Sequence, residues 1–343
     1  DWVTASHELT GLAGHPVVLL RIVFASDGAV QDEGFAFDNI NILSPETVLA
    51  YAGADAHVCP GSSTQIGGNP TAFGGTGVYT YSWSPAIGLD DPNAANPNAM
   101  PAATTTYTLT VTDGAGTTAT ASMTVNVTPS ATFPYFEDFE SGAGDWYDEG
   151  ILSSWELGTP NGPVINTNAP GGTQSWMTDL NGEHGNNENA WIQSPCFNFS
   201  TLLDDPVIGF DVWWEIEFSW DGTVLQSSID GGASWQNVGS LGDPDFWYND
   251  NTINAGPGDQ QTGWTGITPE GDGSGGWVNA RNTLTGLAGE SGVLLRFAFA
   301  SDGAVTEDGI AVDNILIDNS FPLSANAGSD EAICAGESVT IGG

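Results

Sequence analysis

Short runs in which apolar and polar residues alternate occur along most of the chain, separated by turns rich in glycine, proline, asparagine and aspartate. In YTYSWSP the aromatic side chains at 79, 81 and 83 fall on one face of an extended chain, and in YTLTVTD the large side chains at 107, 109 and 111 do the same. No stretch stands out with the 3.6-residue period of an amphipathic helix. The pattern therefore predicts an all-β protein of the sandwich type.

Within this pattern, residues 47–128 predict one small sandwich. Its expected strands span residues 63–66, 79–84, 105–113 and 118–127, and the loops NPTAFGG and LDDPNAANPNAMPA separate them. Threonine occupies most positions opposite the large apolar side chains. We therefore expect sheets with one buried and one solvated face.

The chain also contains an internal repeat. Residues 1–68 align without a gap with residues 276–343, and about half of the positions are identical. The match predicts a tandem array whose repeating unit contains two modules, so that 1–44 are closing strands of one domain and 320–343 the start of another. Residues 1–44 include two apolar runs that need a sandwich body to cover them. We expect that body upstream in the same chain, and the alternative is that these strands complete a sandwich in a neighbouring chain.

Three segments of the smaller module, AGADAHVCPGSS, YTYSWSPAIGL and TTTYTLTVTDGAGTTATASMTVNV, closely resemble the PKD-like, Ig-like repeats of Bacteroidetes surface proteins. The resemblance covers residues 45–128. It implies an Ig-like sandwich. The chain departs from the family near residues 117 and 118, where threonine replaces the usual second cysteine.

Residues 129–319 carry a different set of motifs, including FPYFEDFES, SSWELGTPNG, WIQSPCFNFSTL, SSIDGGASW and GIAVDNILI. These are similar to the MAM-like, concanavalin-type jelly rolls of secreted Bacteroidetes proteins. The resemblance implies a two-sheet jelly roll in adhesive or carbohydrate-associated proteins, often exported by the type IX system. The expected fold is thus a tandem of β-sandwiches in which an Ig-like module alternates with a MAM-like jelly roll.

The charge is strongly unbalanced, with 43 acidic residues, three arginines and no lysine, which gives a formal net charge of −40. Such a surface repels nucleic acid and anionic membranes, so we expect neither as a partner, and no membrane-inserted segment is visible. It would also attract divalent cations. A saline habitat, in which salt screens the repulsion, is an alternative explanation of the charge.

The jelly-roll resemblance further implies a structural calcium ion, held by carboxylates near the first strand and in the last strand. Calcium prefers six to eight oxygen ligands from carboxylate, amide and carbonyl groups. The matching candidates are Asp138, Glu140, Asp179, Asn181 and Asp313, and Asp38 is the repeat equivalent of Asp313.

Aromatic residues suggest a second kind of site. In FDVWWEIEF, one set of alternating side chains is expected in the core: Phe210, Val212, Trp214, Ile216 and Phe218. Trp213 lies on the other face of that strand, and the long loop after residue 240 adds further rings. The candidates for a saccharide-stacking surface are Trp213, Trp247, Tyr248 and Trp264. The alternative is that these rings only pack.

Smaller motifs predict structural roles. The run from Ser228 to Trp235 fits the Asp-box pattern S-x-D-x-G-x-[ST]-W, in which Asp230 would bond the turn backbone. Arg296 and its repeat equivalent Arg21 are expected to form an ion pair or a cation–π contact. The residues leave two readings open for Cys196: a disulfide with an Ig-like cysteine, or a small buried side chain.

No sequence pattern predicts catalysis. The four histidines show no metal-ligand spacing, and nucleophile-elbow, HExxH and P-loop motifs are missing. Glu215 and Glu217 could pair as in a glycosidase, but neighbouring acids are common in so acidic a chain.

We therefore expect a non-enzymatic, extracellular repeat segment of a giant cell-surface adhesin or filament for attachment, gliding or prey contact. Its partners would be further copies of the chain and target-cell surfaces or glycans. The alternatives are a carbohydrate-binding accessory region of a secreted hydrolase and a protective surface layer.

Overall fold

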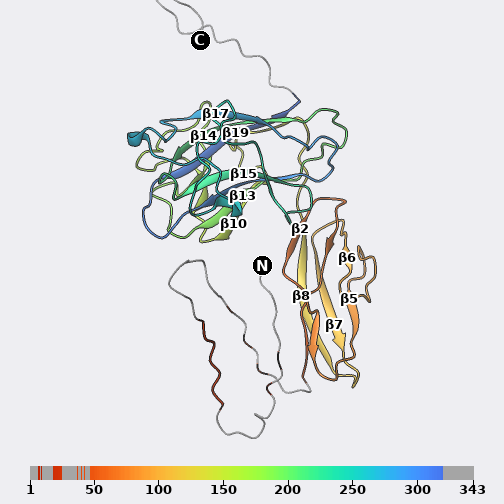
Figure 1. Cartoon of the computed structure of the whole chain (residues 1–343). Coiled ribbons are helices and arrows are strands. Elements are labelled where there is room, and N and C mark those ends of the chain that lie inside the picture. Colours follow the sequence, from red (N-terminus) through yellow and green to blue (C-terminus); the bar gives the residue numbers. More distant parts are fainter. Residues whose placement is uncertain are drawn as a thin grey trace, which may run out of the picture. The chain divides into compact units, whose positions relative to one another are not determined.

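The computed structural model describes residues 47–319, together with a few residues near the start of the chain, namely His7, Leu9, 18–24, Phe37, Ile40 and Ile42. The remainder of the predicted end segments, 1–44 and 320–343, lies outside the described residues. The chain forms two compact units. The smaller contains the described residues up to Ala56 and Ser63–Val127, and the larger contains His57–Ser62 and the residues from Thr128 onward. The regular secondary structure of both units is strand, apart from two short 3₁₀ turns, which confirms the predicted all-β class (Figure 1).

The smaller unit contains one larger sheet and two short strand pairs. The sheet has the order β2 (Ala56–Val58, of which Ala56 belongs to this unit), β8 (Thr118–Val127), β7 (Thr105–Thr112) and β5 (Thr80–Ser84). The pairs are β1 (Val48–Ala50) with β4 (Ala72–Gly74), and β3 (Thr64–Gln65) with β6 (Asn98–Ala99). The four strands that the sequence predicted therefore appear as β3, β5, β7 and β8, with bounds that shift by one residue at most.

Alternation along β7 explains why it forms a strand. Tyr107, Leu109 and Val111 are fully buried, as the sequence predicted. On the opposite face, hydroxyl groups pair across to β8: the Oγ atoms of Thr106 and Thr124 lie 3.0 Å apart. One face thus stabilises the sheet by burial, and the other by cross-strand hydrogen bonds in water.

The larger unit is a sandwich of two antiparallel sheets, visible as two layers in Figure 1. The five-stranded sheet has the order β10 (Tyr147–Ile151), β13 (Asn189–Gln193), β18 (Leu294–Ala300), β15 (Gly222–Ser228) and β16 (Gln236–Asn237). The six-stranded sheet has the order β11 (Trp155–Gly158), β12 (Ser175–Thr178), β19 (Gly309–Asp318), β14 (Val207–Glu215) and β17 (Val278–Thr283), with β9 (Tyr135–Glu137) also paired to β19. Two short 3₁₀ turns, η1 (Pro257–Asp259) and η2 (Thr268–Glu270), lie in the long connection before β17.

A single aromatic-rich core fills the space between these sheets. Phe210 on β14 contacts Phe297 on β18 edge to face, with ring centroids 4.9 Å apart, so the two layers interdigitate. The predicted core set on β14 is confirmed for Phe210, Val212, Trp214 and Ile216. It is wrong for Phe218, which is 41% exposed, because β14 ends at Glu215 and the chain then turns.

A disulfide lies within the larger unit and joins Cys59 to Cys196, with their Cα atoms 5.7 Å apart. The two cysteines are 137 positions apart in sequence. Of the two alternatives that the sequence left open for Cys196, the structure shows the disulfide with an Ig-like cysteine. Cys59 and Cys196 also pack with Leu294 and Trp235 in a small apolar cluster. Among the described residues, no helix has the length and apolar character needed to cross a bilayer.

Candidate functional site

Three of the predicted calcium residues come together where β9, β19 and the loop before β12 meet. A Cβ atom placed on Gly172 would lie 3.0 Å from Glu140 Oε1 and 3.1 Å from Asp313 Oδ2, so these two oxygens flank the same point. Asp313 is fully buried, and its Oδ2 has no hydrogen-bond partner in the described ranges of the chain. Burial raises the pKa of Asp313 to about 7, and the nearby charges of Asp211, Glu140 and Asp138 act in the same direction.

The other two predicted calcium residues lie in a separate turn. Asp179 Oδ1 accepts a hydrogen bond from the backbone N–H of Asn181, 3.0 Å away. Asp179 directly follows β12, in which Trp176 pairs with Val312 of β19. In that register Ser175 lies opposite Asp313, and Asp179 is four positions further along the chain. At the rise of a β-strand, four positions separate Asp179 from Ser175 by roughly 13 Å. The five candidates therefore do not form one ligand set.

The predicted saccharide residues are all buried. Trp247, Tyr248 and Trp264 belong to the main core, and each polar ring atom donates to a backbone carbonyl. Trp213 packs beneath a loop, in a cluster with Ile165 and Met177. A sugar stacks on an exposed ring face, which none of these four residues offers. The structure therefore places all four rings in apolar clusters of the interior, which agrees with the alternative that these rings only pack.

A polar row crosses the outer face of the five-stranded sheet instead. Strand register aligns one polar residue on each strand, in the order Tyr147, Gln193, Arg296, Gln226 and Asn237. These positions alternate with core residues such as Ile192, Leu225 and Phe297, so their side chains lie on the face turned away from the core. The row is a tertiary feature because its five members come from five strands.

Arg296 is the central residue of the polar row. Its guanidinium carbon lies 4.8 Å from the ring centroid of Trp191 and 4.2 Å from that of Trp235. Its Nε and one Nη donate to Gln226 Oε1, at 2.9 and 2.7 Å. Burial lowers the pKa of Arg296 to about 10. The structure shows the predicted cation–π contact, and no carboxylate among the described residues lies within ion-pair distance of Arg296.

Beside Arg296 the row borders a groove of about 550 Å³, in the size range of small-ligand sites. Its walls include Gln226, Ser234, Trp235, Asn237, Gln260 and Arg296. The amides form a chain: Gln226 Nε2 donates to Asn237 Oδ1 at 3.1 Å, and Asn237 Nδ2 donates to Gln260 Oε1 at 2.7 Å. The groove thus combines a half-buried tryptophan with fixed donors and acceptors.

The Asp-box hairpin forms the rim of this groove. Asp230 Oδ1 accepts from the backbone N–H of Ser234 at 2.9 Å, and Oδ2 accepts from the Ser234 hydroxyl at 2.6 Å. Burial by itself would raise the pKa of Asp230, but the hydrogen bonds from Ser234 and Ser228 lower it. As predicted, the motif shapes a turn.

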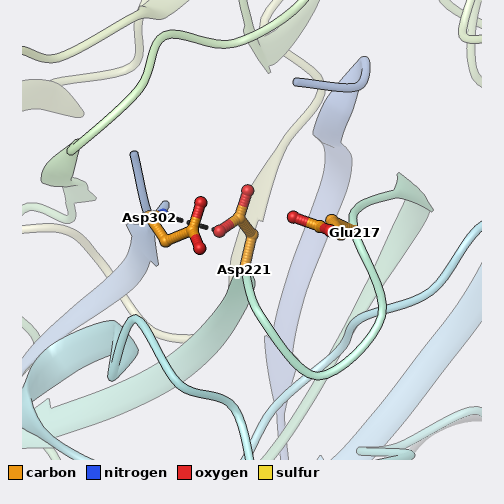
Figure 2. Close-up of side chains that lie close together, drawn as sticks. All are labelled: Glu217, Asp221 and Asp302. Carbon is orange, nitrogen blue, oxygen red and sulfur yellow. Dashed lines mark hydrogen bonds between the residues drawn. The ribbon is translucent and has the colours of Figure 1, made fainter. Parts of the chain in front are cut away.

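Another cluster of carboxylates lies at the other end of β15, and of its members only Glu217 was considered from the sequence, as a possible partner of Glu215. Glu217, Asp221 and Asp302 each place a carboxylate oxygen within 4.8 Å of the others' (Figure 2). Asp221 directly precedes β15, Glu217 follows β14, and Asp302 follows β18. We call these three residues the acidic triad. One signal was available: Asp302 stands in FASDGAV, a segment that recurs identically around Asp27.

The triad contains two carboxylate oxygens that lack donors. Asp221 is fully buried, and its Oδ1 accepts from the backbone N–H of Asp302 at 2.6 Å. Within the part of the chain that the structure describes, its Oδ2 has no hydrogen-bond partner. Glu217 Oε2 is likewise buried without a partner. Burial raises the pKa of Asp221 to about 7, with the charges of Asp302 and Glu217 adding to the effect.

His184 lies beside the triad but does not neutralise it. Its Nε2 lies 3.5 Å from Asp221 Oδ2. The same Nε2 is the acceptor of the Glu307 backbone N–H, and Nδ1 lies 2.9 Å from the carbonyl oxygen of Gly185. Both contacts are satisfied by a neutral ring that carries its proton on Nδ1, and burial lowers the pKa of His184. In that tautomer Nε2 carries no proton that it could donate to Asp221.

No family model matches this chain. Bacillopeptidase F of Bacillus subtilis (strain 168) is 24% identical over 194 residues, which cover 56% of this chain and only 11% of that protein. A solved carbohydrate-binding module of the β-sandwich superfamily aligns with 80% of this chain and 99% of its own, at 13% identity and a TM-score of 0.32. The K1 cleaved adhesin domain of Lys-gingipain from Porphyromonas gingivalis W83 aligns with 55% of this chain and 98% of its own, at 13% identity and a TM-score of 0.31.

Proposed function

We propose that this chain is a segment of an extracellular adhesive repeat protein whose larger unit binds a saccharide in the groove beside Arg296. The observation that carries the proposal is the polar row, which ends in an open groove beside Trp235. Fixed amide donors and acceptors next to an aromatic ring suit a ligand that carries many hydroxyl groups. Glycans on a target surface are therefore the ligand class we propose.

An extracellular location is supported by the disulfide between Cys59 and Cys196, because structural disulfides persist in oxidising compartments. The internal repeat supports an array in which PKD-like and MAM-like modules alternate. Many weak, identical contacts along such a thread would give avidity without any strong single site. Further copies of the chain, in a fibre or bundle, are the second class of partner in this proposal.

We propose a binding role rather than a catalytic one. The two acids considered as a glycosidase pair have separate surroundings: Glu215 accepts from the backbone N–H and hydroxyl of Thr268, whereas Glu217 belongs to the acidic triad. Cys59 and Cys196 are joined in the disulfide, so neither offers a free thiol as a nucleophile.

A structural calcium ion at Asp138, Glu140 and Asp313 remains part of the proposal. The unpartnered, fully buried Oδ2 of Asp313 supports it. Asp179 and Asn181 are not included, because they lie in the separate turn after β12.

Glycan binding by the 343-residue chain tests the proposal. A glycan array would identify a saccharide, and calorimetry would give its affinity. We expect Trp235→Ala to weaken binding about tenfold, equivalent to about 1.4 kcal/mol, and Asn237→Ala to weaken it less. Phe136→Ala removes a 57% exposed aromatic side chain on β9 and is the matched control, expected to bind as the wild type does. Absence of binding to every saccharide on the array would refute the groove's role.

The second candidate function is an accessory region of a large secreted hydrolase. The local similarity to a protein named Bacillopeptidase F favours it. Sequencing the full-length gene separates the two candidates. Further copies of the repeat support the filament, and a hydrolase domain in the same chain supports the accessory region.

A further inference from the structure

We propose that the acidic triad of Glu217, Asp221 and Asp302 is a calcium site that ties the two sheets of the larger unit together at one end. The site is distinct from the one around Asp313, and it is independent of saccharide binding.

The distances fit a single ion. Calcium binds oxygen at about 2.3–2.6 Å, so two ligands on opposite sides of one ion lie about 4.8 Å apart. In the triad, one oxygen from each carboxylate lies within 4.8 Å of both others. Figure 2 shows the Asp221 carboxyl group between those of Asp302 and Glu217, with the Glu217 carboxyl pointing toward it. One ion could therefore contact all three without a change of backbone.

The second observation is the state of Asp221. A fully buried carboxylate oxygen without a donor costs folding free energy, and native structures rarely retain one without a reason. His184 offers it no proton in the neutral tautomer, since Nε2 already accepts from the backbone of Glu307. Asp221 Oδ2 therefore has no hydrogen-bond partner among the described residues, and a cation in the triad would provide one.

The chemistry of the ligands selects the ion. Three carboxylates supply only hard oxygen donors, and no sulfur or free imidazole nitrogen joins them. The ligands come from two turns and are not held in a fixed octahedron, which favours calcium over magnesium because magnesium demands near-ideal geometry. Water would complete the six to eight ligands that calcium takes.

The position of the triad shows what the ion would do. Glu217 follows β14 of the six-stranded sheet. Asp221 and Asp302 flank the paired strands β15 and β18 of the five-stranded sheet, where Gly222 faces Ala300. Without a cation, three negative groups at this junction repel one another. With calcium bound, the same groups would link the layers.

The test is calcium binding and thermal unfolding of the 343-residue chain, with wild type, Glu217→Gln, Asp302→Asn and Asp221→Asn. We expect each substitution to weaken one calcium site at least about tenfold, because ligand charge sets calcium affinity. Asp204→Asn, which changes an exposed carboxylate outside the triad, is the control and should bind calcium as the wild type does. Asp313→Asn identifies any ion at the other site.

Thermal unfolding of Asp221→Asn gives the decisive comparison. In excess chelator we expect this variant to melt at or above the wild-type temperature, because it removes one of three repelling charges. In excess calcium we expect it to melt below the wild type. A purely structural buried acid would give the same order in both conditions, and that result would overturn the proposal. So would a single calcium site that Asp313→Asn abolishes and the triad variants leave intact.

Discussion

An aspartate lies at each end of strand β15, and the pKa values of the two carboxyl groups are shifted in opposite directions. Asp230, after the strand, receives hydrogen bonds on both oxygens from Ser228 and Ser234, which lower its pKa. Asp221, before the strand, is pressed against two other acids and leaves one oxygen unpartnered, and burial raises its pKa to about 7. The difference shows that the nearby hydrogen-bond donors, rather than the residue type, decide the state of an aspartate. With donors it stabilises a turn, and without them it keeps an unpartnered oxygen that a cation could bind.

The neighbours of each end explain the contrast. The hairpin brings hydroxyl and backbone donors from positions two to four residues away, so Asp230 is satisfied locally. At the other end, Asp221 is surrounded by the carboxylates of Glu217 and Asp302 and by the unprotonated Nε2 of His184. None of these three groups donates a hydrogen bond to its Oδ2.

We expect the disulfide to stabilise the part of the larger unit near Asp230, and to leave the calcium response of the triad unchanged. Replacing both Cys59 and Cys196 by serine removes a crosslink over 137 positions, and we expect a loss of about 2–4 kcal/mol in the free energy of unfolding. Chemical denaturation with and without reductant measures it. The calcium-dependent stabilisation should persist in the double variant. Equal stability of oxidised and reduced wild type would contradict the first part.

Removing the carboxylate of Asp230 should destabilise the hairpin at every calcium concentration. Asp230→Ala deletes the acceptor for Ser228 and Ser234, and we expect a loss of about 1–2 kcal/mol. Asp230→Asn keeps one acceptor oxygen and should lose less. Chemical denaturation in calcium and in chelator checks both variants. A loss that depends on calcium would contradict the assignment of Asp230 as a turn residue.

Hydrogen exchange compares the two ends within one molecule. We expect calcium to slow exchange of the amides of Trp220, Asp221 and Asp302 about tenfold, because all three hydrogen-bond within the triad loops. Amides of the Asp230 hairpin should exchange at the same rate in calcium and in chelator. Mass spectrometry on peptic fragments resolves the two segments. Equal slowing at both ends would mean that calcium acts globally rather than at the triad.

The smallest effect is expected at Asp204. This carboxylate is exposed and lies in neither group. Asp204→Asn should change the free energy of unfolding by less than about 0.5 kcal/mol in calcium or in chelator, as surface substitutions usually do. A larger, calcium-dependent change would show that general surface charge, rather than the triad, controls the response to calcium.

Local pattern was sufficient for much of the fold. Alternation at Tyr107, Leu109 and Val111 predicted β7, because the two-residue period of a strand is read directly from neighbouring positions. The spacing from Ser228 to Trp235 predicted a turn for the same reason, since every partner of Asp230 lies within four residues.

The aromatic residues show where local pattern fails. Trp247 and Trp264 were candidates for a saccharide surface, because a long polar loop carries them, and packing was the alternative. The fold turns both rings inward against Phe210. Period alone cannot tell which of two faces another layer will cover. At Phe218 the alternation was extended past the end of β14, because a strand's end depends on the turn that follows.

From the sequence alone follow the all-β class, the repeat and the Asp-box hairpin, whereas Arg296 was left open between an ion pair and a cation–π contact, and the structure shows the latter. Only the tertiary structure decided which acids meet and which rings are covered. Asp221 and Asp302 are 81 positions apart, and they meet because β15 and β18 pair with Gly222 opposite Ala300. The polar row likewise exists only because five strands align in register. Contacts within a few residues follow from backbone geometry, whereas contacts between distant strands depend on which pairing buries the most apolar surface.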